Sequence, residues 1–134
     1  MSKSDNDSKG RIELTDSEDE IRNKIRKSVT DSKGYLTFDP ANRPGISNLI
    51  SIHAALSNVT PEQICERNLK LDTVSYKDLL AEVIIERLKP IRVNIQRLLK
   101  ERQHLVNIIN TGNDRANNIA SKTYDDVKRL IGFI

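Results

Sequence analysis

The chain is poor in the residues that build disulfides, metal sites and aromatic cores. Its 134 residues include one cysteine (Cys65), two histidines and no tryptophan, and aromatic residues make up only 4%. A single cysteine excludes an internal disulfide, and two histidines beside it fall short of the ligand set of a structural zinc site. What remains is room for one domain with a modest, mainly aliphatic core.

Long apolar runs are also missing. No uninterrupted apolar run exceeds three residues, as at 83–85 (VII), whereas a membrane-spanning helix needs about 20. The first ten residues, MSKSDNDSKG, contain no apolar stretch, and the acidic Asp5 and Asp7 do not suit a mitochondrial presequence. We therefore expect no transmembrane helix, no secretory signal peptide and no presequence at this position.

Positive charge is concentrated in the C-terminal part of the chain. Residues 1–39 carry eight Lys and Arg against nine Asp and Glu, and residues 40–82 carry four against five. Residues 83–134 carry ten against five, which accounts for the formal net charge of +3. A basic helical surface is a common footprint of nucleic-acid binding. An ordinary solvated helix surface has the same composition, and charge alone does not distinguish the two.

Apolar spacing predicts a first helix over residues 17–29. Ile21, Ile25 and Val29 recur every four residues and follow an acidic stretch that suits the positive end of a helix dipole. The irregular, proline-containing connection after this helix includes residues 35–38 (YLTF). This is the one strand candidate in the sequence.

Two further helices are predicted in the middle of the chain. Apolar positions over residues 46–56 define one helical face, on which His53 is included. Thr60 stands before a proline and three residues before Gln63, which is the pattern of a capping box. This pattern predicts a short helix over residues 61–67.

The longest predicted helix runs from residue 75 to about residue 111. It carries an amphipathic stripe of the type found in bundles. The expected core positions of this stripe are Ile84, Leu88, Ile91, Ile95, Leu98, Leu105 and Ile109. Pro90 removes one helical hydrogen bond and clashes with the preceding turn, so we expect a kink or break near Lys89.

A last helix is expected after Gly112, with Gly112 as the C-cap of the preceding helix and Asn113 as the new N-cap. Its expected inner face comprises Ala116, Ile119, Ala120, Val127, Leu130 and Ile131. The fold class predicted is therefore all-α, a helical bundle of four to five helices preceded by a mobile loop.

The sequence contains no complete active-site motif. It has no Walker loop, no Gly-x-Ser-x-Gly and no Cys–His pair at motif spacing. We interpret Cys65 as a part-buried, unreactive thiol, His53 as a core histidine with a hydrogen-bond partner, and His104 as exposed. The paired carboxylates Asp125 and Asp126 are interpreted as part of a solvated helix face.

The N-terminal residues MSKSD (1–5) resemble the KMSKS signature loop of class I aminoacyl-tRNA synthetases, without its leading lysine. Further segments resemble, in order and spacing, those of bacterial-type tryptophanyl-tRNA synthetases over essentially the whole chain. These segments are residues 29–32 (VTDS), 44–49 (PGISNL), 83–86 (VIIE), 89–91 (KPI) and 112–120. The final eight residues, VKRLIGFI, are most similar to the animal mitochondrial form.

The resemblance implies an enzyme that activates tryptophan with ATP and magnesium, releases pyrophosphate and transfers the amino acid to tRNA(Trp). The family consists of homodimers with a Rossmann nucleotide-binding domain and an appended helical domain. It implies that this chain is the C-terminal portion, with the Rossmann catalytic domain absent. On this basis residues 1–16 form the signature loop and its connection, and residues 17–134 form the tRNA-binding domain. The implied location is the mitochondrial matrix, or alternatively the bacterial cytoplasm, without membrane contact.

The same resemblance assigns roles to individual residues. Lys3 matches the second lysine of the signature and is the candidate catalytic cation, and it contacts ATP together with Met1, Ser2 and Ser4. A mobile lysine suits this task because negative charge develops on the departing pyrophosphate. No metal-binding residue is implied. Candidate tRNA contacts, proposed only as a group, are Arg92, Arg97, Lys100, Arg102, Arg115 and Lys122.

Two other readings stay open at this point. One is a non-catalytic basic helical module that binds RNA, which predicts binding with strong salt dependence. The other is a purely structural bundle with no RNA affinity. If the chain is the C-terminal portion of a synthetase, we expect the 134 residues alone to have no aminoacylation activity. The nucleotide-binding half and the first signature lysine are not among them.

Overall fold

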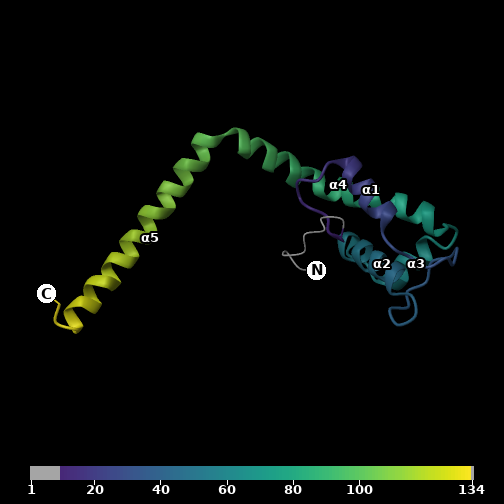
Figure 1. Cartoon of the computed structure of the whole chain (residues 1–134), viewed down its shortest axis with the longest axis horizontal. Helices are drawn as coiled ribbons and strands as arrows, with labels where there is room; N and C mark the ends of the chain where they lie inside the picture. The colour runs from purple at the N-terminus through teal and green to yellow at the C-terminus, as the bar shows by residue number, and fades with distance from the viewer. Residues whose placement is uncertain (1–9, 134) are drawn as a thin grey trace. The chain divides into compact units, whose positions relative to one another are not determined.

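The computed structural model describes residues 10–133, and this part of the chain is all-α (Figure 1). Its helices are α1 (Glu18–Lys27), α2 (Pro44–Ser57), α3 (Pro61–Arg67), α4 (Thr73–Lys100) and α5 (Arg102–Leu130). The described residues contain no strand. The predicted fold class is therefore confirmed, and the strand candidate at residues 35–38 is wrong.

The chain divides into two compact units, one ending at Val93 and one beginning at Asn94, and each is described by itself. This division does not test the predicted boundary between a signature-loop segment at 1–16 and a helical domain at 17–134, which stays a prediction. The first unit contains the hydrophobic core. The core residues are Ile21, Ile25, Leu36, Ile46, Leu49, Ile50, Ala54, Ile64, Tyr76, Leu80, Ala81, Ile84 and Ile85.

Capping boxes begin two of the helices in the first unit. At α1, the Ser17 hydroxyl accepts from the Glu20 backbone N–H, and the Glu20 carboxylate accepts from the Ser17 N–H. At α3, Thr60 and Gln63 make the same reciprocal pair, which confirms the predicted start of this helix. Each box satisfies backbone donors that would otherwise have no partner at the helix start.

Helix α1 lies antiparallel to the first part of α4. The Arg26 Nε donates to the Asp78 carboxylate at 2.8 Å, and one turn earlier in α1 the Arg22 Nε donates to Glu82 at 2.8 Å. The lower residue number in α1 thus pairs with the higher residue number in α4, as in two antiparallel helices. The apolar sides of both helices face the core through Ile21, Ile25 and Leu80, among others.

Helix α4 continues through Pro90 to Lys100, so there is no break near Lys89. Proline removes a single helical hydrogen bond. The turns before Pro90 are anchored by the buried Ile84 and Ile85, and the turn after it is anchored by the buried Arg92. This packing on both sides holds the proline inside the helix.

The interruption between the long helices lies at Glu101, whose backbone (φ −91°, ψ 54°) leaves the helical region. Helix α5 then passes through Gly112 and Asn113, so the predicted helix end and start at these two residues are wrong. Glycine in a helix interior costs only about 1 kcal/mol relative to alanine. The 29-residue helix α5 continues through this position despite that cost.

The predicted apolar stripe is buried only in the first unit. Ile84 is buried and Leu88 packs partly against the core, as expected, but Ile91 is 42% exposed. In the second unit α5 contains no buried residue. Its predicted inner face is exposed throughout, at Ala116, Ile119, Ala120, Val127, Leu130 and Ile131. The second unit contains only the end of α4 beside α5, and these few turns do not cover the apolar side chains of α5.

Candidate functional site

The residues predicted to contact ATP, Met1, Ser2, Lys3 and Ser4, lie outside the described residues. The described structure begins just after them, and there Asp16 anchors the connection to α1. The Asp16 carboxylate accepts from the Glu13 backbone N–H at 2.8 Å and from the Lys24 ammonium at 2.6 Å. Asp16 is buried. The connection is therefore fixed to α1 before the helix starts.

Arg92 joins this connection to α4. Its guanidinium donates to the Asp16 backbone carbonyl at 3.0 Å and to the Glu18 carboxylate at 3.3 Å. Only 7% of Arg92 is exposed. Of the six predicted tRNA-binding residues, Arg92 is thus the one whose charge is directed into the protein. The contact ties the segment after the signature-like loop to the far half of α4.

Arg43 organises the loop between α1 and α2. Its guanidinium makes a bidentate pair with Asp31 at 2.7 and 2.8 Å and also donates to the Thr37 hydroxyl at 2.6 Å. The same group lies over the Tyr35 ring, 4.9 Å from its centroid. Hydrogen bonding to Arg43 lowers the pKa of Asp31 to about 2. Sequence reasoning missed this cluster because its members are separated by an irregular loop with no periodicity.

The nucleophilic and titratable groups of the core have structural partners. His53 Nδ1 lies 3.2 Å from the Tyr76 hydroxyl, and both residues are buried. Burial lowers the pKa of His53, and the nearby Arg67 lowers it further. Burial also raises the pKa of the part-buried Cys65 thiol. The interpretation of His53 as a partnered core histidine and of Cys65 as part-buried is confirmed, while the low reactivity of Cys65 stays a prediction.

Helix α5 has an exposed basic side. Arg115 and Lys122 are exposed and seven residues apart, so they lie on the same side of the helix at a rise of about 10 Å. Arg129 extends this row by another seven residues and pairs with Asp126 at 3.8 Å. The sequence spacing alone could have indicated Arg129, which was not among the predicted contacts.

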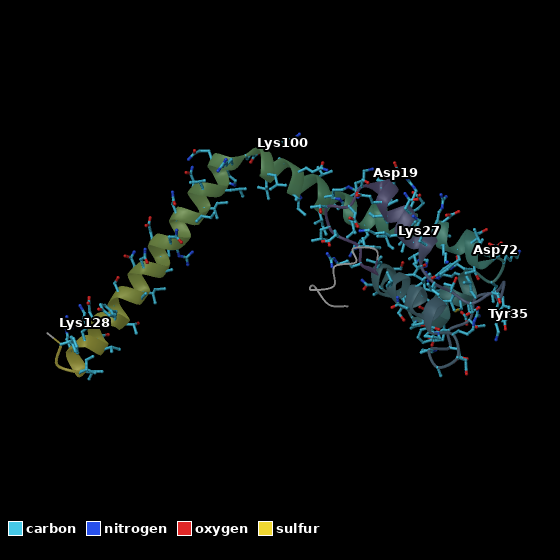
Figure 2. All side chains as sticks on the ribbon, viewed as in Figure 1. Asp19, Lys27, Tyr35, Asp72, Lys100 and Lys128 are labelled. Atoms are coloured by element: carbon cyan, nitrogen blue, oxygen red, sulfur yellow. The ribbon has the colours of Figure 1, made fainter. Side chains whose placement is uncertain are left out.

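The remaining predicted tRNA contacts lie around the start of α5. The Arg97 Nη1 donates to both carboxylate oxygens of Glu101 at 2.9 Å, and both side chains are exposed. Lys100 and Arg102 are exposed on either side of Glu101. Figure 2 marks Lys100 at this point of the chain and Lys128 near the end of α5. The second unit thus places five of the six predicted cations at its surface.

No helix in the described part of the chain is long and apolar enough to span a membrane. The described residues also contain no cluster of three or more His, Cys, Asp or Glu side chains able to hold a metal ion.

An exposed basic helix surface is a common footprint of nucleic-acid binding, and the comparison with protein families identifies the chain further. The family of class I tRNA synthetases for tryptophan and tyrosine (W and Y) matches residues 1–89. The chain belongs to this family.

Within the family, the similar proteins are tryptophan–tRNA ligases. The ligase of Rickettsia typhi is 39% identical over 134 residues, covering 100% of this chain and 41% of that protein. The ligase of Bacillus subtilis is 37% identical over 132 residues, or 98% of this chain and 40% of that protein. The chloroplastic/mitochondrial ligase of Arabidopsis thaliana is 36% identical over 133 residues, or 99% of this chain and 33% of that protein.

A solved structure is also similar to the chain. The tryptophanyl-tRNA synthetase of Mycoplasma pneumoniae has a TM-score of 0.66 and 26% sequence identity, and the match covers 98% of this chain and 42% of that one. The chain therefore spans about two fifths of the length of the relatives it matches.

Proposed function

We propose that this chain is the signature-loop and tRNA-binding portion of a tryptophan–tRNA ligase. The observation that carries the proposal is similarity at 36–39% identity over essentially all 134 residues to ligases of this one specificity. The ligase joins tryptophan to tRNA(Trp) in two steps, with ATP and magnesium as substrate. In this proposal the tryptophan site and the rest of the nucleotide site, apart from the signature loop, belong to the part of the relatives that has no counterpart here.

In this proposal Lys3 meets the β- and γ-phosphates of ATP as negative charge develops on the leaving pyrophosphate. Met1, Ser2 and Ser4 complete the loop around the phosphates. The fixed connection behind the loop supports this role, because Asp16 and Arg92 hold it to two helices. A loop that closes on its substrate needs a rigid base.

The second part of the proposal is that the cations of the second unit bind tRNA phosphates. The exposed row of Arg115, Lys122 and Arg129 supports it, since cations spaced along one side of a helix follow a phosphate backbone. Arg97, Lys100 and Arg102 extend the positive surface. Because Arg92 is engaged by Asp16 and Glu18, its replacement is expected to alter stability as well as binding.

Binding of tRNA(Trp) to the purified chain tests this assignment. Arg115→Ala with Lys122→Ala is expected to weaken binding about tenfold and to reduce the slope of log K against log salt by roughly 1.5 to 2. The matched control, Lys33→Ala with Lys70→Ala, removes the same charge from exposed positions of the first unit. Equal losses in the two double variants, or binding that is independent of salt, would contradict the assignment.

Activity tests the catalytic part of the proposal. The 134 residues alone are expected to give no tryptophan-dependent ATP–pyrophosphate exchange. Joined to the N-terminal part of the Bacillus subtilis ligase, the chain is expected to support exchange, and Lys3→Ala is expected to abolish most of it. Exchange by the isolated chain, or full activity of the Lys3→Ala chimera, would refute the role given to this loop.

The homodimeric state and the mitochondrial matrix location remain part of the proposal. The relatives include bacterial and chloroplastic/mitochondrial ligases. The alternative reading as a non-catalytic RNA-binding module predicts the same salt-dependent binding, and it is separated from the ligase reading by the chimera's exchange activity.

A further inference from the structure

The turn that leads into α1 is closed on itself by Asp16. The Asp16 backbone N–H donates to the Glu13 carbonyl at 3.2 Å, and the Glu13 N–H donates to the Asp16 carboxylate at 2.8 Å. The Lys24 ammonium, eight residues further along the chain, donates to the same carboxylate at 2.6 Å. The Lys24 and Asp16 side chains are only 16% and 9% exposed, so water screens this pair little. The path of the chain from Glu13 to Asp16 is thus fixed before α1 begins.

Arg92 joins this turn to α4. Its Nη1 donates to the Asp16 carbonyl at 3.0 Å, and its Nη2 donates to the Glu18 carboxylate at 3.3 Å. The Asp16 carbonyl lies at the N-terminal end of α1, where the helix dipole is positive and disfavours a second positive charge. The Glu18 carboxylate compensates for this repulsion. The buried guanidinium therefore has its place between these two acceptors.

The turn is attached to the first unit a short distance after the signature-like residues. Lys3 precedes Asp16 by thirteen positions and Ile12 by nine. Ile12 packs partly against the hydrophobic core, so the chain is held at Ile12 as well as at Asp16. The direction in which the chain leaves the unit toward Lys3 is set at these two anchors, and Arg92 holds one of them.

Arg92 differs in this respect from the other cations predicted to bind tRNA. Its two hydrogen bonds and its burial direct the charge toward the start of α1. The other five cations are exposed: Arg97, Lys100, Arg102, Arg115 and Lys122. A guanidinium engaged inside the protein would have to give up these bonds to reach an RNA phosphate, so its contacts favour a role in the turn.

On the basis of the proposed function, we infer that Arg92 is a positioning residue for the activation of tryptophan, acting on Lys3 through the turn at Asp16. A loop cation lowers the barrier only where it meets negative charge as that charge develops. A displacement of about 1 Å caused by a distant substitution can cost a rate of about a hundredfold. In this role Arg92 touches neither ATP nor tryptophan.

Tryptophan-dependent ATP–pyrophosphate exchange, measured without tRNA, tests this role in the chimera with the N-terminal part of the Bacillus subtilis ligase. Arg92→Gln is expected to lower kcat about tenfold and to leave the KM for tryptophan unchanged, because Lys3 acts on the leaving pyrophosphate. Rates are taken per active site, counted from the burst of tryptophanyl-adenylate, so that unfolded protein does not contribute. Arg92→Lys keeps a donor for the Asp16 carbonyl and is expected to recover part of the rate.

The matched control is Arg87→Gln, which removes the same charge from an exposed position of α4. It is expected to change neither kcat nor KM. A double-substitution cycle then separates positioning from stability. If Arg92 acts through Lys3, Arg92→Gln adds little to the loss caused by Lys3→Ala, because the group that Arg92 positions is already gone.

Hydrogen exchange of the isolated chain tests the anchor without activity. In Arg92→Gln the amides of Glu13 and Asp16, which close the turn, are expected to exchange at least tenfold faster, while those of residues 80–85 in the core of α4 stay unchanged. Unchanged exchange at the turn, an unchanged kcat, or losses from Arg92→Gln and Lys3→Ala that multiply in full would overturn this role and leave the proposed function standing. A chimera without exchange, or one that stays fully active with Lys3→Ala, contradicts the proposed function and the role of Arg92 with it.

Discussion

Beside its hydrophobic core, the first unit contains two buried arginines whose charges have partners. Arg43 and Arg92 are both less than 10% exposed, and each is bound by a carboxylate and a backbone carbonyl. Among the described residues, no buried side-chain nitrogen or oxygen lacks a hydrogen-bond partner. Removing one member of a buried pair leaves the other buried without a hydrogen-bond partner. This loss lowers the free energy of unfolding more than the loss of an exposed ion pair does.

Arg43→Ala is expected to lower the melting temperature by roughly 5–10 °C, because several charge-assisted hydrogen bonds are lost. It is also expected to return the pKa of Asp31 from about 2 toward its usual value, measured by NMR titration. The stabilisation that Asp31 provides is complete above its unfolded pKa and is lost as the pH falls toward 2. Arg26→Ala, which breaks an exposed pair with Asp78, is the control and is expected to have a small effect.

The buried His53 gives the fold a second, milder pH dependence. Because burial lowers its pKa in the folded state, the unfolded chain binds more protons just below pH 6.5. The melting temperature is therefore expected to fall between pH 7 and pH 5.5, and His53→Gln is expected to flatten this slope. His104→Gln, on an exposed position of α5, is the control. An unchanged slope in His53→Gln would contradict this account.

At the scale of single elements, the sequence predicts a helix boundary where a local pattern sets it, and misses a boundary that depends on packing or on the backbone of one residue. The capping box at Thr60 is a local pattern of four residues, and it appears in the structure as predicted. Whether α4 passes Pro90 depends on packing before and after the proline, and no local pattern contains that information. No glycine or proline lies next to Glu101, so no local sequence signal predicts the interruption of the helix there.

Two glycines at different elements predict opposite effects of one substitution. Gly112→Ala, in the interior of α5 with no heavy atom within 4 Å of the added Cβ, is expected to raise helix stability by about 0.5–1 kcal/mol. Gly45→Ala forces a Cβ to within 2.4 Å of the Val29 carbonyl oxygen and is expected to destabilise the first unit. Thermal melts followed by circular dichroism measure the change in stability of each variant. A change in the same direction in both variants would contradict this account.

At the scale of the whole molecule, the two units differ in what stabilises them. The first has a continuous core, whereas α5 in the second contains no buried residue. The amphipathic pattern of α5 correctly predicts a helix, but the pattern cannot show whether its apolar side is covered. At the candidate site, too, the sequence pattern shows which side chains share a helix side but does not show which of them are buried. The exposed row at Arg115 and Lys122 follows from sequence spacing, while the burial of Arg92 depends on residues 16 and 18, far away in the chain.

Hydrogen exchange of the isolated chain is expected to separate the units. Amides of α5 are expected to exchange at least a hundredfold faster than those of residues 76–85 in α4, because only the latter are covered by a core. Equal protection in both segments would show that the apolar side of α5 is covered in solution.

The uncovered side of α5 has a consequence for the fate of the chain in a cell. Val127, Leu130 and Ile131 have branched apolar side chains that are 47%, 86% and 62% exposed within their own unit. Chaperones and proteases bind exposed apolar surfaces. A protein that exposes such a surface more of the time is therefore present at a lower level in the cell. Synthesised without a cover for this helix, the chain is expected to be cleared quickly, so its steady-state level would report whether a cover is present.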